Sequence, residues 1–373
     1  MKTYRVTVIA GDGIGKEVTP GAMAVVDRVA TKTGAFSVDW VEVPWSCEWY
    51  VEHGSMMPSD GLDQLRGSDA ILLGAVGFPG VPDHISLRGL LIPIRQEFRQ
   101  YANVRPLQLW SGVEGPLRDK GVGDLDILCV RENAEGEYSG SGGILKTSSG
   151  RVATQVSVFT ENGIERVVRY AMETARQRRG RLASATKSNA LQYSAVLWDE
   201  VVDRVAQDYP DVNVTHYHVD ALAARFVSAP ETLDVVVASN LFGDILTDLG
   251  AALQGSLGLA ASANLNPERD FPSMFEPVHG SAPDIAGRGI GNPVGAIWSA
   301  AMMLEHLGEV EAGGLVMAAL RSVVDRGPRT RDMGGDATTD QVVAAVLGAV
   351  DNATLGTELL TAGVGDLGEG SSP

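Results

Sequence analysis

The sequence predicts an α/β fold with a mostly parallel sheet. Short apolar segments with the character of buried strands alternate along the chain with longer segments of helical periodicity, as in strand–helix–strand units. The first of these strands runs into a glycine-rich turn that opens a helix. With 373 residues, of which 44% are hydrophobic, the chain is long enough for two domains with large cores.

The elements follow one another in a regular order. We expect a buried strand at 4–10 (YRVTVIA), then the turn GDGIGKEV and a helix at 17–32. An alternating strand at 37–43, an apolar strand at 69–74 and a helix at 90–101 come next. Further apolar strands are predicted at 126–130 and 234–238, and further helices at 163–177, 193–208, 245–253, 296–307 and 339–350.

Two segments rich in glycine and serine interrupt this order. Residues 140–151 (GSGGILKTSSGR) have strand-like flanks and are predicted to form either a flexible linker or a protruding arm. The last residues are rich in glycine, serine and acids, and we expect a disordered tail at 356–373.

The formal net charge of −17 narrows the choice of partners. Such a field repels phosphate backbones and anionic membranes, so neither nucleic acid nor a membrane is an expected partner. Neither Cys47 nor Cys129 belongs to a CxxC pair, which argues against a zinc ribbon or a disulfide framework. The start has no signal-peptide pattern and the chain has no long apolar run, so a cytoplasmic protein is expected.

The early glycine loop contains Gly11, Gly13 and Gly15, between a strand and a helix. That context suits a dinucleotide loop, but the spacing is G-x-G-x-G rather than G-x-G-x-x-G, and a P-loop is absent. A tight turn that needs positive φ angles explains the glycines equally well. The loop by itself identifies no ligand.

Asp244 and Asp248 lie in NLFGDILTD, directly after an apolar strand. A helix places both carboxylates on one face, just beyond the carboxyl end of that strand, where α/β proteins bind ligands. A hard divalent cation would offset their repulsion, and Asp220 in HYHVDALAARF could complete such a site. One helix-terminal aspartate beside one solvated aspartate is the alternative.

An acidic protein that binds a dicarboxylate needs converging guanidinium groups, because their forks match carboxylates. The candidates are Arg95, Arg105 in ANVRP, and Arg131 at the end of an apolar strand. Arg99 is more simply explained as a surface residue. A charge at the position of Arg131 requires a partner.

Two further side chains suit proton transfer. Lys187 follows the small-residue strand LASAT, and a lysine in such a place can act as a base or a proton relay. Tyr138 follows Arg131 by seven residues, and its phenol could protonate a carbanion-like intermediate. Each residue taken alone could equally be structural.

Nine motifs in a fixed order resemble one enzyme family. They are GDGIGKEV, DAILLGAVG, ANVRP, VRENAEGEYSG, TKSNA, HVDALAA, SNLFGDILTDLG, FEPVHGSAPDIAGRGIGNP and MMLEHLG, between about residues 4 and 350. This pattern resembles the β-decarboxylating dehydrogenases, which act on isopropylmalate, isocitrate, homoisocitrate, tartrate and D-malate. VPDHISL, SANLNPER and FPSMFEPVHGSAPDIAG are most similar to the tartrate and D-malate branch.

The resemblance implies an isopropylmalate dehydrogenase-like two-domain fold, not a standard Rossmann fold. Residues 1–103 with 252–355 would form a large, discontinuous cofactor-binding domain. Residues 104–251 would form a smaller domain for substrate binding and dimerisation, with a protruding arm near 139–157. The protein would be a homodimer with shared active sites.

The resemblance also implies roles for individual residues. Arg95, Arg105 and Arg131 would bind the substrate carboxylates, and Asp220, Asp244 and Asp248 would ligate Mg²⁺ or Mn²⁺. Tyr138 and Lys187 would transfer protons, with Lys187 and Asp220 reaching across from the partner subunit. The cofactor would be held by Glu276, His279, Gly280, Ser281, Ala282, Asp284 and Asn292.

Cofactor and substrate preferences rest on three positions. A carboxylate at Asp284 can accept hydrogen bonds from ribose hydroxyls and would repel a 2′-phosphate, so NAD is predicted. Isopropylmalate enzymes carry an acid and a threonine where this chain has Leu87 and Arg88, and the tartrate and D-malate relatives usually carry an aromatic residue at the second position. Arg88 would either add a cation for an acidic substrate or face solvent.

The prediction is therefore an NAD- and metal-dependent oxidative decarboxylation of a small (R)-2-hydroxy dicarboxylic acid. D-malate, giving pyruvate and CO₂, is preferred, with tartrate and 3-isopropylmalate as alternatives. A non-catalytic regulatory paralogue is disfavoured because the predicted proton-transfer and metal residues are all present. A phosphotransfer protein built on GDGIGK lacks the Lys-Ser/Thr ending of a Walker motif.

Overall fold

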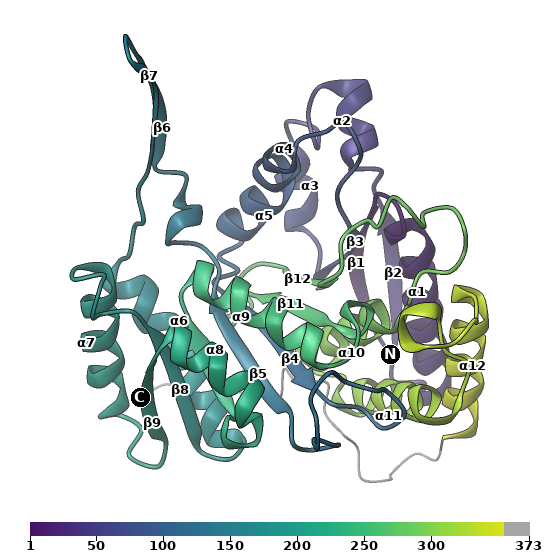
Figure 1. Cartoon of the computed structure of the whole chain (residues 1–373). Helices are drawn as coiled ribbons and strands as arrows, with labels where there is room; N and C mark the ends of the chain where they lie inside the picture. The colour runs from purple at the N-terminus through teal and green to yellow at the C-terminus, as the bar shows by residue number, and fades with distance from the viewer. Residues whose placement is uncertain (354–373) are drawn as a thin grey trace.

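In the computed structural model, residues 1–353 can be described, and ten of their strands form one sheet (Figure 1). The strand order is β2-β1-β3-β12-β11-β4-β5-β10-β8-β9, and only the three pairings from β12 to β5 are antiparallel. The bounds are β1 Lys2–Gly11, β2 Phe36–Glu42, β3 Ala70–Ala75, β4 Ala102–Gln108, β5 Asp126–Glu132, β8 Arg181–Thr186, β9 Asn213–His218, β10 Val235–Ala238, β11 Ala261–Leu265 and β12 Ser273–Pro277. The predicted α/β class with a largely parallel sheet is confirmed.

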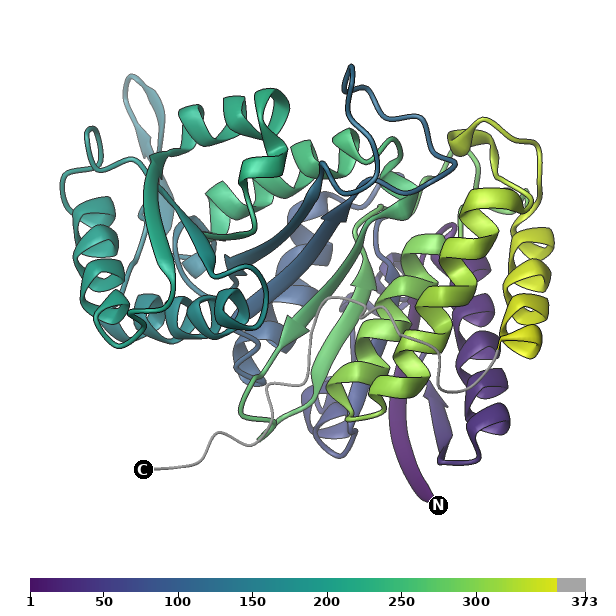
Figure 2. The same ribbon diagram turned by 90° about the horizontal axis from the view of Figure 1, so that it is seen from below.

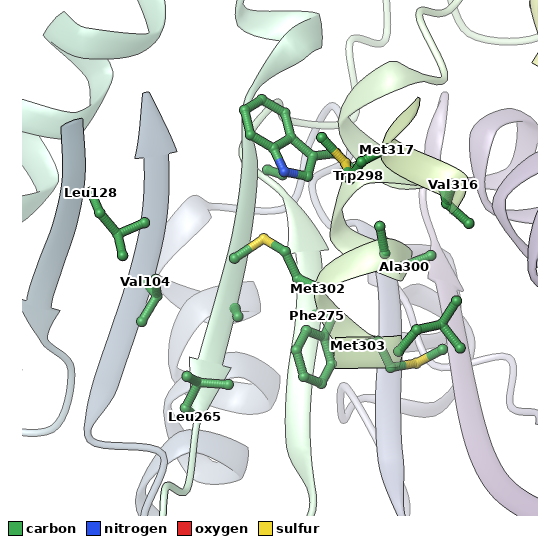
Figure 3. Packing of buried hydrophobic residues seen from close by; sticks show 14 of the residues in the cluster. Val104, Leu128, Leu265, Phe275, Trp298, Ala300, Met302, Met303, Val316 and Met317 are labelled. Carbon is green, nitrogen blue, oxygen red and sulfur yellow. The ribbon is translucent and has the colours of Figure 1, made fainter. Parts of the chain in front are cut away.

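Long helices cover one face of the sheet. One group packs over β3, β12 and β11, and another over β5, β10 and β8 (Figure 2). The first group is α1 (Gly15–Thr33), α10 (Val294–His306), α11 (Val310–Arg326) and α12 (Thr339–Asn352), and the second is α6 (Glu161–Gln177) and α7 (Ser194–Ala206). Trp298 and Met302 of α10 pack beside Phe275 of β12 in this core (Figure 3). Burying such side chains is the main force that holds the helices to the sheet.

The opposite face carries two separate apolar clusters. One cluster involves β1, β3 and β12 with α2 (Cys47–His53), α3 (Gly61–Arg66), a π-helical turn (Leu87–Leu91) and α5 (Ile92–Glu97). The other involves β4, β5 and β10 with α8 (Val219–Ser228) and α9 (Asn240–Leu253). The antiparallel strands β12, β11, β4 and β5 lie between the two clusters, and on this face they carry polar side chains.

A two-stranded hairpin projects away from the main body (Figure 1). It consists of β6 (Gly142–Thr147) and β7 (Gly150–Gln155), and every residue of both strands is exposed. Of the two alternatives for the Gly/Ser-rich segment, an arm rather than a linker is therefore observed.

Most predicted elements occur within a few residues of their expected bounds, but one helix was wrong. The helix expected at 90–101 ends at Glu97, because Arg99 has φ +48° and the chain enters β4 at Ala102. Helices α2, α3, α4 (Asp83–Ser86), α8 and α11 and strands β4, β9, β11 and β12 were not predicted.

The predicted domain division stays a prediction; its boundary at 103 falls inside β4, and the sheet continues across it. The predicted tail at 356–373 lies outside the described residues. Within residues 1–353, no helix is both long and apolar enough to cross a membrane.

Candidate active site

Three buried arginines point to the polar part of the second face. Arg95 comes from α5, Arg105 from β4 and Arg131 from the carboxyl end of β5, and each side chain is largely shielded from solvent. Burying a guanidinium is costly unless charges and hydrogen bonds compensate it. The partners of these arginines therefore define the site.

Helix α9 supplies the counter-charges for two of the arginines. Asp244 forms a short ion pair with Arg131 Nη1, and its Oδ1 lies 3.7 Å from Arg105 Nη2. Asp248, one turn further along the helix, has Oδ1 3.4 Å from Arg105 Nη1. The predicted placement of both aspartates on one helical face beyond a strand is observed, because α9 starts directly after β10.

Neutral side chains of α9 also contact Arg105 and Arg131. Together with Asp244 and Asp248 they surround these two guanidinium groups, and we call this set the arginine cluster. Asn240 Oδ1 accepts hydrogen bonds from Nε and Nη2 of Arg131, at 3.0 and 2.6 Å. Thr247 Oγ1 accepts one from Arg105 Nη1 at 2.8 Å. These bonds fix the planes of both guanidinium groups, which is what bidentate carboxylate binding requires.

Burial and neighbouring charges act in opposite directions on the pKa values of these residues. Burial, followed by the neighbouring Arg105, lowers the pKa of Arg131 to about 10, although Asp244 opposes both. Burial alone would raise the pKa of Asp244, but Arg131 and Arg105 outweigh it and hold the pKa of this carboxyl below its usual value. At neutral pH Asp244 is therefore a carboxylate paired with the guanidinium ion of Arg131.

Tyr138 lies at the edge of the arginine cluster, in the 3₁₀ turn η2 (Glu137–Ser139). Its hydroxyl donates a hydrogen bond to Asp244 Oδ2 at 3.0 Å, and the Arg131 guanidinium lies 5.5 Å from the centre of its ring. Burial, followed by the charge of Asp244, raises the pKa of the phenol above its usual value. The phenol is therefore protonated at neutral pH and able to donate a proton.

Lys187 and Asp220 form a separate pair on the surface. Lys187 Nζ lies 2.6 Å from Asp220 Oδ1, and 69% of the Asp220 side chain is exposed. Within the described part of the chain, no three acidic, histidine or cysteine side chains meet in a geometry that would hold a metal ion. One chain thus brings Asp244 and Asp248 together and leaves Asp220 elsewhere.

Arg95 lies between the arginine cluster and the predicted cofactor segment. Its Nη2 lies 2.8 Å from Glu276 Oε1, while its buried Nε has no hydrogen-bond partner. A cavity of about 170 Å³ is lined by Arg95, Arg105 and Glu276 together with residues that include Leu91, Ser262, His279 and Gly280. An unpaired guanidinium N–H beside such a cavity suits an anionic ligand.

The predicted cofactor residues form a loop against the early glycine turn. Ile14 donates its backbone N–H to Ser281 O at 2.9 Å, and a β-carbon on Gly13 would lie 2.0 Å from that oxygen. Gly13 also has φ +55°, so the turn requires glycine for its conformation and for close packing. The tight-turn interpretation therefore accounts for the glycines, and the turn supports the loop.

The remaining loop residues differ in their exposure and in whether their polar groups already have hydrogen-bond partners. His279 is buried, and its Nε2 has no partner, so a ligand in the adjoining cavity can satisfy it. Gly280 and Asp284 are exposed, and Ala282 has φ +43°. Asn292, by contrast, already donates to Asp332 and accepts from the Val294 N–H.

The two predicted specificity positions lie in the π-helical turn. Leu87 is partly buried and Arg88 is exposed. A β-carbon on Gly140 would lie 3.1 Å from Arg88 Nη1, so this arginine reaches the base of the hairpin rather than open solvent alone.

Several polar residues of the site were not predicted. Asn240 and Thr247 orient the arginines, and three buried amides, Asn103, Asn133 and Asn264, lie between them and Glu276. The alternation of polar residues in ASANLN and in ANVR was an available signal, because residues two apart on a strand share one face.

Comparison with known proteins identifies the family of the chain. The family model for isocitrate/isopropylmalate dehydrogenase matches residues 5–346. A D-malate dehydrogenase [decarboxylating] of Escherichia coli is 52% identical over 355 residues, covering 93% of this chain and 98% of the relative. A probable tartrate dehydrogenase/decarboxylase of Bacillus subtilis is 49% identical over 92% of this chain and 96% of its own.

A solved structure has the same architecture. The crystal structure of isocitrate dehydrogenase from Methylococcus capsulatus superimposes with a TM-score of 0.83 at 35% identity, covering 93% of this chain and 99% of that one. The resemblance to the tartrate and D-malate branch, and with it the expectation of a decarboxylating dehydrogenase, is confirmed. The chain belongs to the isocitrate/isopropylmalate dehydrogenase family.

Proposed function

We propose that this chain catalyses the oxidative decarboxylation of D-malate to pyruvate and CO₂, with NAD and a divalent cation. The observation that supports this most directly is the group of three buried arginines: Arg105 and Arg131 contact Asp244, which also accepts a hydrogen bond from Tyr138, and Arg95 and Arg105 line a small cavity. The E. coli relative, a D-malate dehydrogenase [decarboxylating], supports this choice of substrate.

The arginines bind the two carboxylates of the substrate. Arg105 and Arg131 are held by α9, and Arg95 is held by Glu276, so their forks are preorganised before the ligand arrives.

Proton transfer requires two residues. Lys187 accepts the proton of the 2-hydroxyl group as C2 becomes a ketone. When the β-carboxylate leaves as CO₂, its bonding electron pair remains on C3, and the phenol of Tyr138 protonates that carbon. The raised pKa of Tyr138, caused chiefly by burial, keeps this proton on the phenol until it is needed.

Asp244 and Asp248 hold Mg²⁺ or Mn²⁺, with Asp220 of a second copy as the third carboxylate. Oxygen donors of this kind are those that hard divalent cations prefer. Such a cation would supply electron withdrawal at the C2 oxygen of the substrate, and NAD would supply the acceptor for the hydride that leaves C2. Asp220 is exposed and Lys187, its ion-pair partner, is partly exposed, which suits a role in the site of a neighbouring subunit.

A homodimer brings these halves together. Ile144 and Leu145 of the hairpin are 60% and 66% exposed, and Ile245 on α9 is 57% exposed. Apolar side chains in such positions are expected to be covered by another protein surface. No nucleic acid or membrane partner is proposed, and a cytoplasmic location stays a prediction.

NAD binds along Glu276–Asn292. The unpaired Nε2 of His279 and the exposed carboxylate of Asp284 fit the adenine and ribose portions, and Asp284 disfavours a 2′-phosphate. Replacing Asp284 by Ala should therefore improve the use of NADP relative to NAD.

A substrate panel tests the proposal. D-malate, both chiral tartrates, 3-isopropylmalate and isocitrate are compared by NADH formation with Mn²⁺ present. D-malate should give the highest kcat/KM, tartrate less, and EDTA should abolish the activity. Preference for 3-isopropylmalate would favour the alternative enzyme, and no turnover with any member would favour a regulatory paralogue.

A further inference from the structure

A row of polar side chains crosses the middle of the sheet. Asn264 of β11 is directly opposite Met274 of β12 on one side and Asn103 of β4 on the other, and Asn103 is in turn opposite Arg131 of β5. Directly opposite residues share a face of the sheet. The row therefore runs from one apolar cluster to the other, beneath the candidate site.

Asn264 is the centre of this row and is completely buried. Its Nδ2 donates to Glu276 Oε1 at 2.8 Å and to Met274 O at 3.3 Å. Its Oδ1 accepts from Asn103 Nδ2 at 3.0 Å and from Asn133 Nδ2 at 2.9 Å. Both hydrogens and both lone pairs of the amide are therefore used, which fixes its orientation.

The two bonds to Glu276 and Asn103 extend to two arginines. Glu276 Oε1, which accepts from Asn264, also lies 2.8 Å from Arg95 Nη2. Asn103 Oδ1 accepts from Arg105 Nε at 2.9 Å. One buried amide thus stands midway between the two guanidinium groups that line the cavity.

The third bond extends toward the phenol. Asn133 begins the loop that follows β5 and leads to Tyr138, and its Nδ2 donates to Gln100 O as well as to Asn264. Asn264 is therefore bonded directly to β4, β12 and the loop that leads to Tyr138, and it reaches Arg95 of α5 through Glu276.

A purely structural role explains this network poorly. Met274, directly opposite Asn264 on the same face, is an apolar core residue, and another apolar side chain at position 264 would avoid the cost of burying several amides. Asn266 offers a contrast: it is also buried, but its side chain bonds to Glu268 and Phe271 in the β11–β12 turn and to the backbone carbonyl of Arg99, whereas Asn264 bonds to Glu276 and Asn103.

We propose that Asn264 is a positioning residue that sets the spacing between Arg95 and Arg105 and ties both to the loop carrying Tyr138. It touches no substrate, and it acts through Glu276, Asn103 and Asn133. The proposal rests on the proposed function, because the arginines are taken to bind the substrate carboxylates.

The test compares Asn264→Ser with the matched control Asn266→Ser. Asn264→Ser should raise KM for D-malate about tenfold and lower kcat, because misplaced binding groups weaken both substrate binding and the transition state. Asn266→Ser also removes a buried amide, so it should lower the Tm by about as much as Asn264→Ser does. It should nevertheless leave KM and kcat as in the wild type. Equal kinetics in the two variants would overturn the proposal.

Two further measurements keep the test decisive. If Asn264→Ser does not fold, Asn103→Ser removes only the connection to Arg105. It should raise KM while kcat changes less, and wild-type kinetics in that variant would overturn the proposal.

If the wild type oxidises no hydroxy acid, the proposed function fails on its own. Crystal structures then decide the positioning role: Arg95 or Arg105 displaced in the variant supports it, and both unmoved overturns it.

Discussion

The two halves of the candidate site are built very differently. Arg95, Arg105, Arg131 and Asp244 are tied to one another inside a single chain by ion pairs and amide hydrogen bonds. Lys187 and Asp220 form an ion pair with each other, and 28% and 69% of their side chains are exposed. The buried half is preorganised by its own fold, whereas the more exposed half is predicted to be completed by a second subunit.

Asp244→Asn attacks the buried half at its centre. The substitution removes the counter-charge of Arg131 and one proposed metal ligand, so turnover should fall by about a thousandfold, the order expected when a cation that stabilises the transition state is lost. NADH formation and Mn²⁺ titration by calorimetry measure the two losses.

Asp234→Asn is the matched control for that variant. Asp234 is buried and lies 2.8 and 3.1 Å from nitrogens of Arg178 and Arg179, away from the site. Its replacement should lower the Tm and leave kcat/KM and Mn²⁺ affinity unchanged. A similar loss of Mn²⁺ binding in both variants would count against Asp244 as a ligand.

Tyr138→Phe removes one hydroxyl from the buried half and keeps its packing. Turnover should fall about a hundredfold, the lower end of the effect of a general acid, while KM for D-malate changes little. Steady-state kinetics separate the two constants. Tyr4→Phe, which deletes a hydroxyl bonded to Leu307 O and Glu309, is the control and should leave kcat unaltered. Full turnover in Tyr138→Phe would refute its role as proton donor.

A mixed dimer tests whether the exposed half serves the other subunit. Lys187→Ala and Tyr138→Phe homodimers should both be nearly inactive. A purified heterodimer of the two has one site with both defects and one intact site, so it should recover about half of the wild-type activity.

The control heterodimer combines Tyr138→Phe with Asp244→Asn. Both of these changes lie in the buried half, so each site carries one defect and no activity should return. Recovery in neither heterodimer would mean that Lys187 serves its own chain.

The sequence was sufficient to predict the buried charges but not their connections. Asp244 was predicted from its place after an apolar strand, and Arg131 from a charge at a strand end that needed a partner. Both inferences are local, and the parallel architecture follows from local patterns as well. The end of the helix at Glu97 was missed, because it depends on the positive φ of Arg99 and not on periodicity.

The amide network depended on information that no local pattern contains. Asn103 and Asn264 are 161 residues apart, and their pairing comes from the antiparallel register of β11 with β4. The expected pattern of parallel strands gave no reason to place them together. A buried uncharged amide is also harder to recognise in a sequence than a buried charge is, although burial without a hydrogen-bond partner is costly for both.

Glu132 provides the smallest and most specific test of the buried half. Its carboxylate accepts hydrogen bonds from the N–H groups of Ala134 and Glu135, at 2.7 to 3.1 Å, and shapes the loop before Tyr138. Burial raises its pKa from 4.5 to about 7, so the folded chain holds this proton more tightly than the unfolded chain does. The stability that this provides is complete below pH 4.5 and is lost as the pH rises through about 7.

Glu132→Gln keeps the shape of the side chain and removes the ionisation. The Tm of the variant relative to the wild type should therefore rise between pH 5 and pH 8, because only the wild type must bury a carboxylate at the higher pH. Calorimetry at matched ionic strength measures the difference. If the Tm difference between the variant and the wild type stayed constant across this range, the fold would stabilise the Glu132 carboxylate as well as water does in the unfolded chain. Glu132 would then be no uncompensated buried charge.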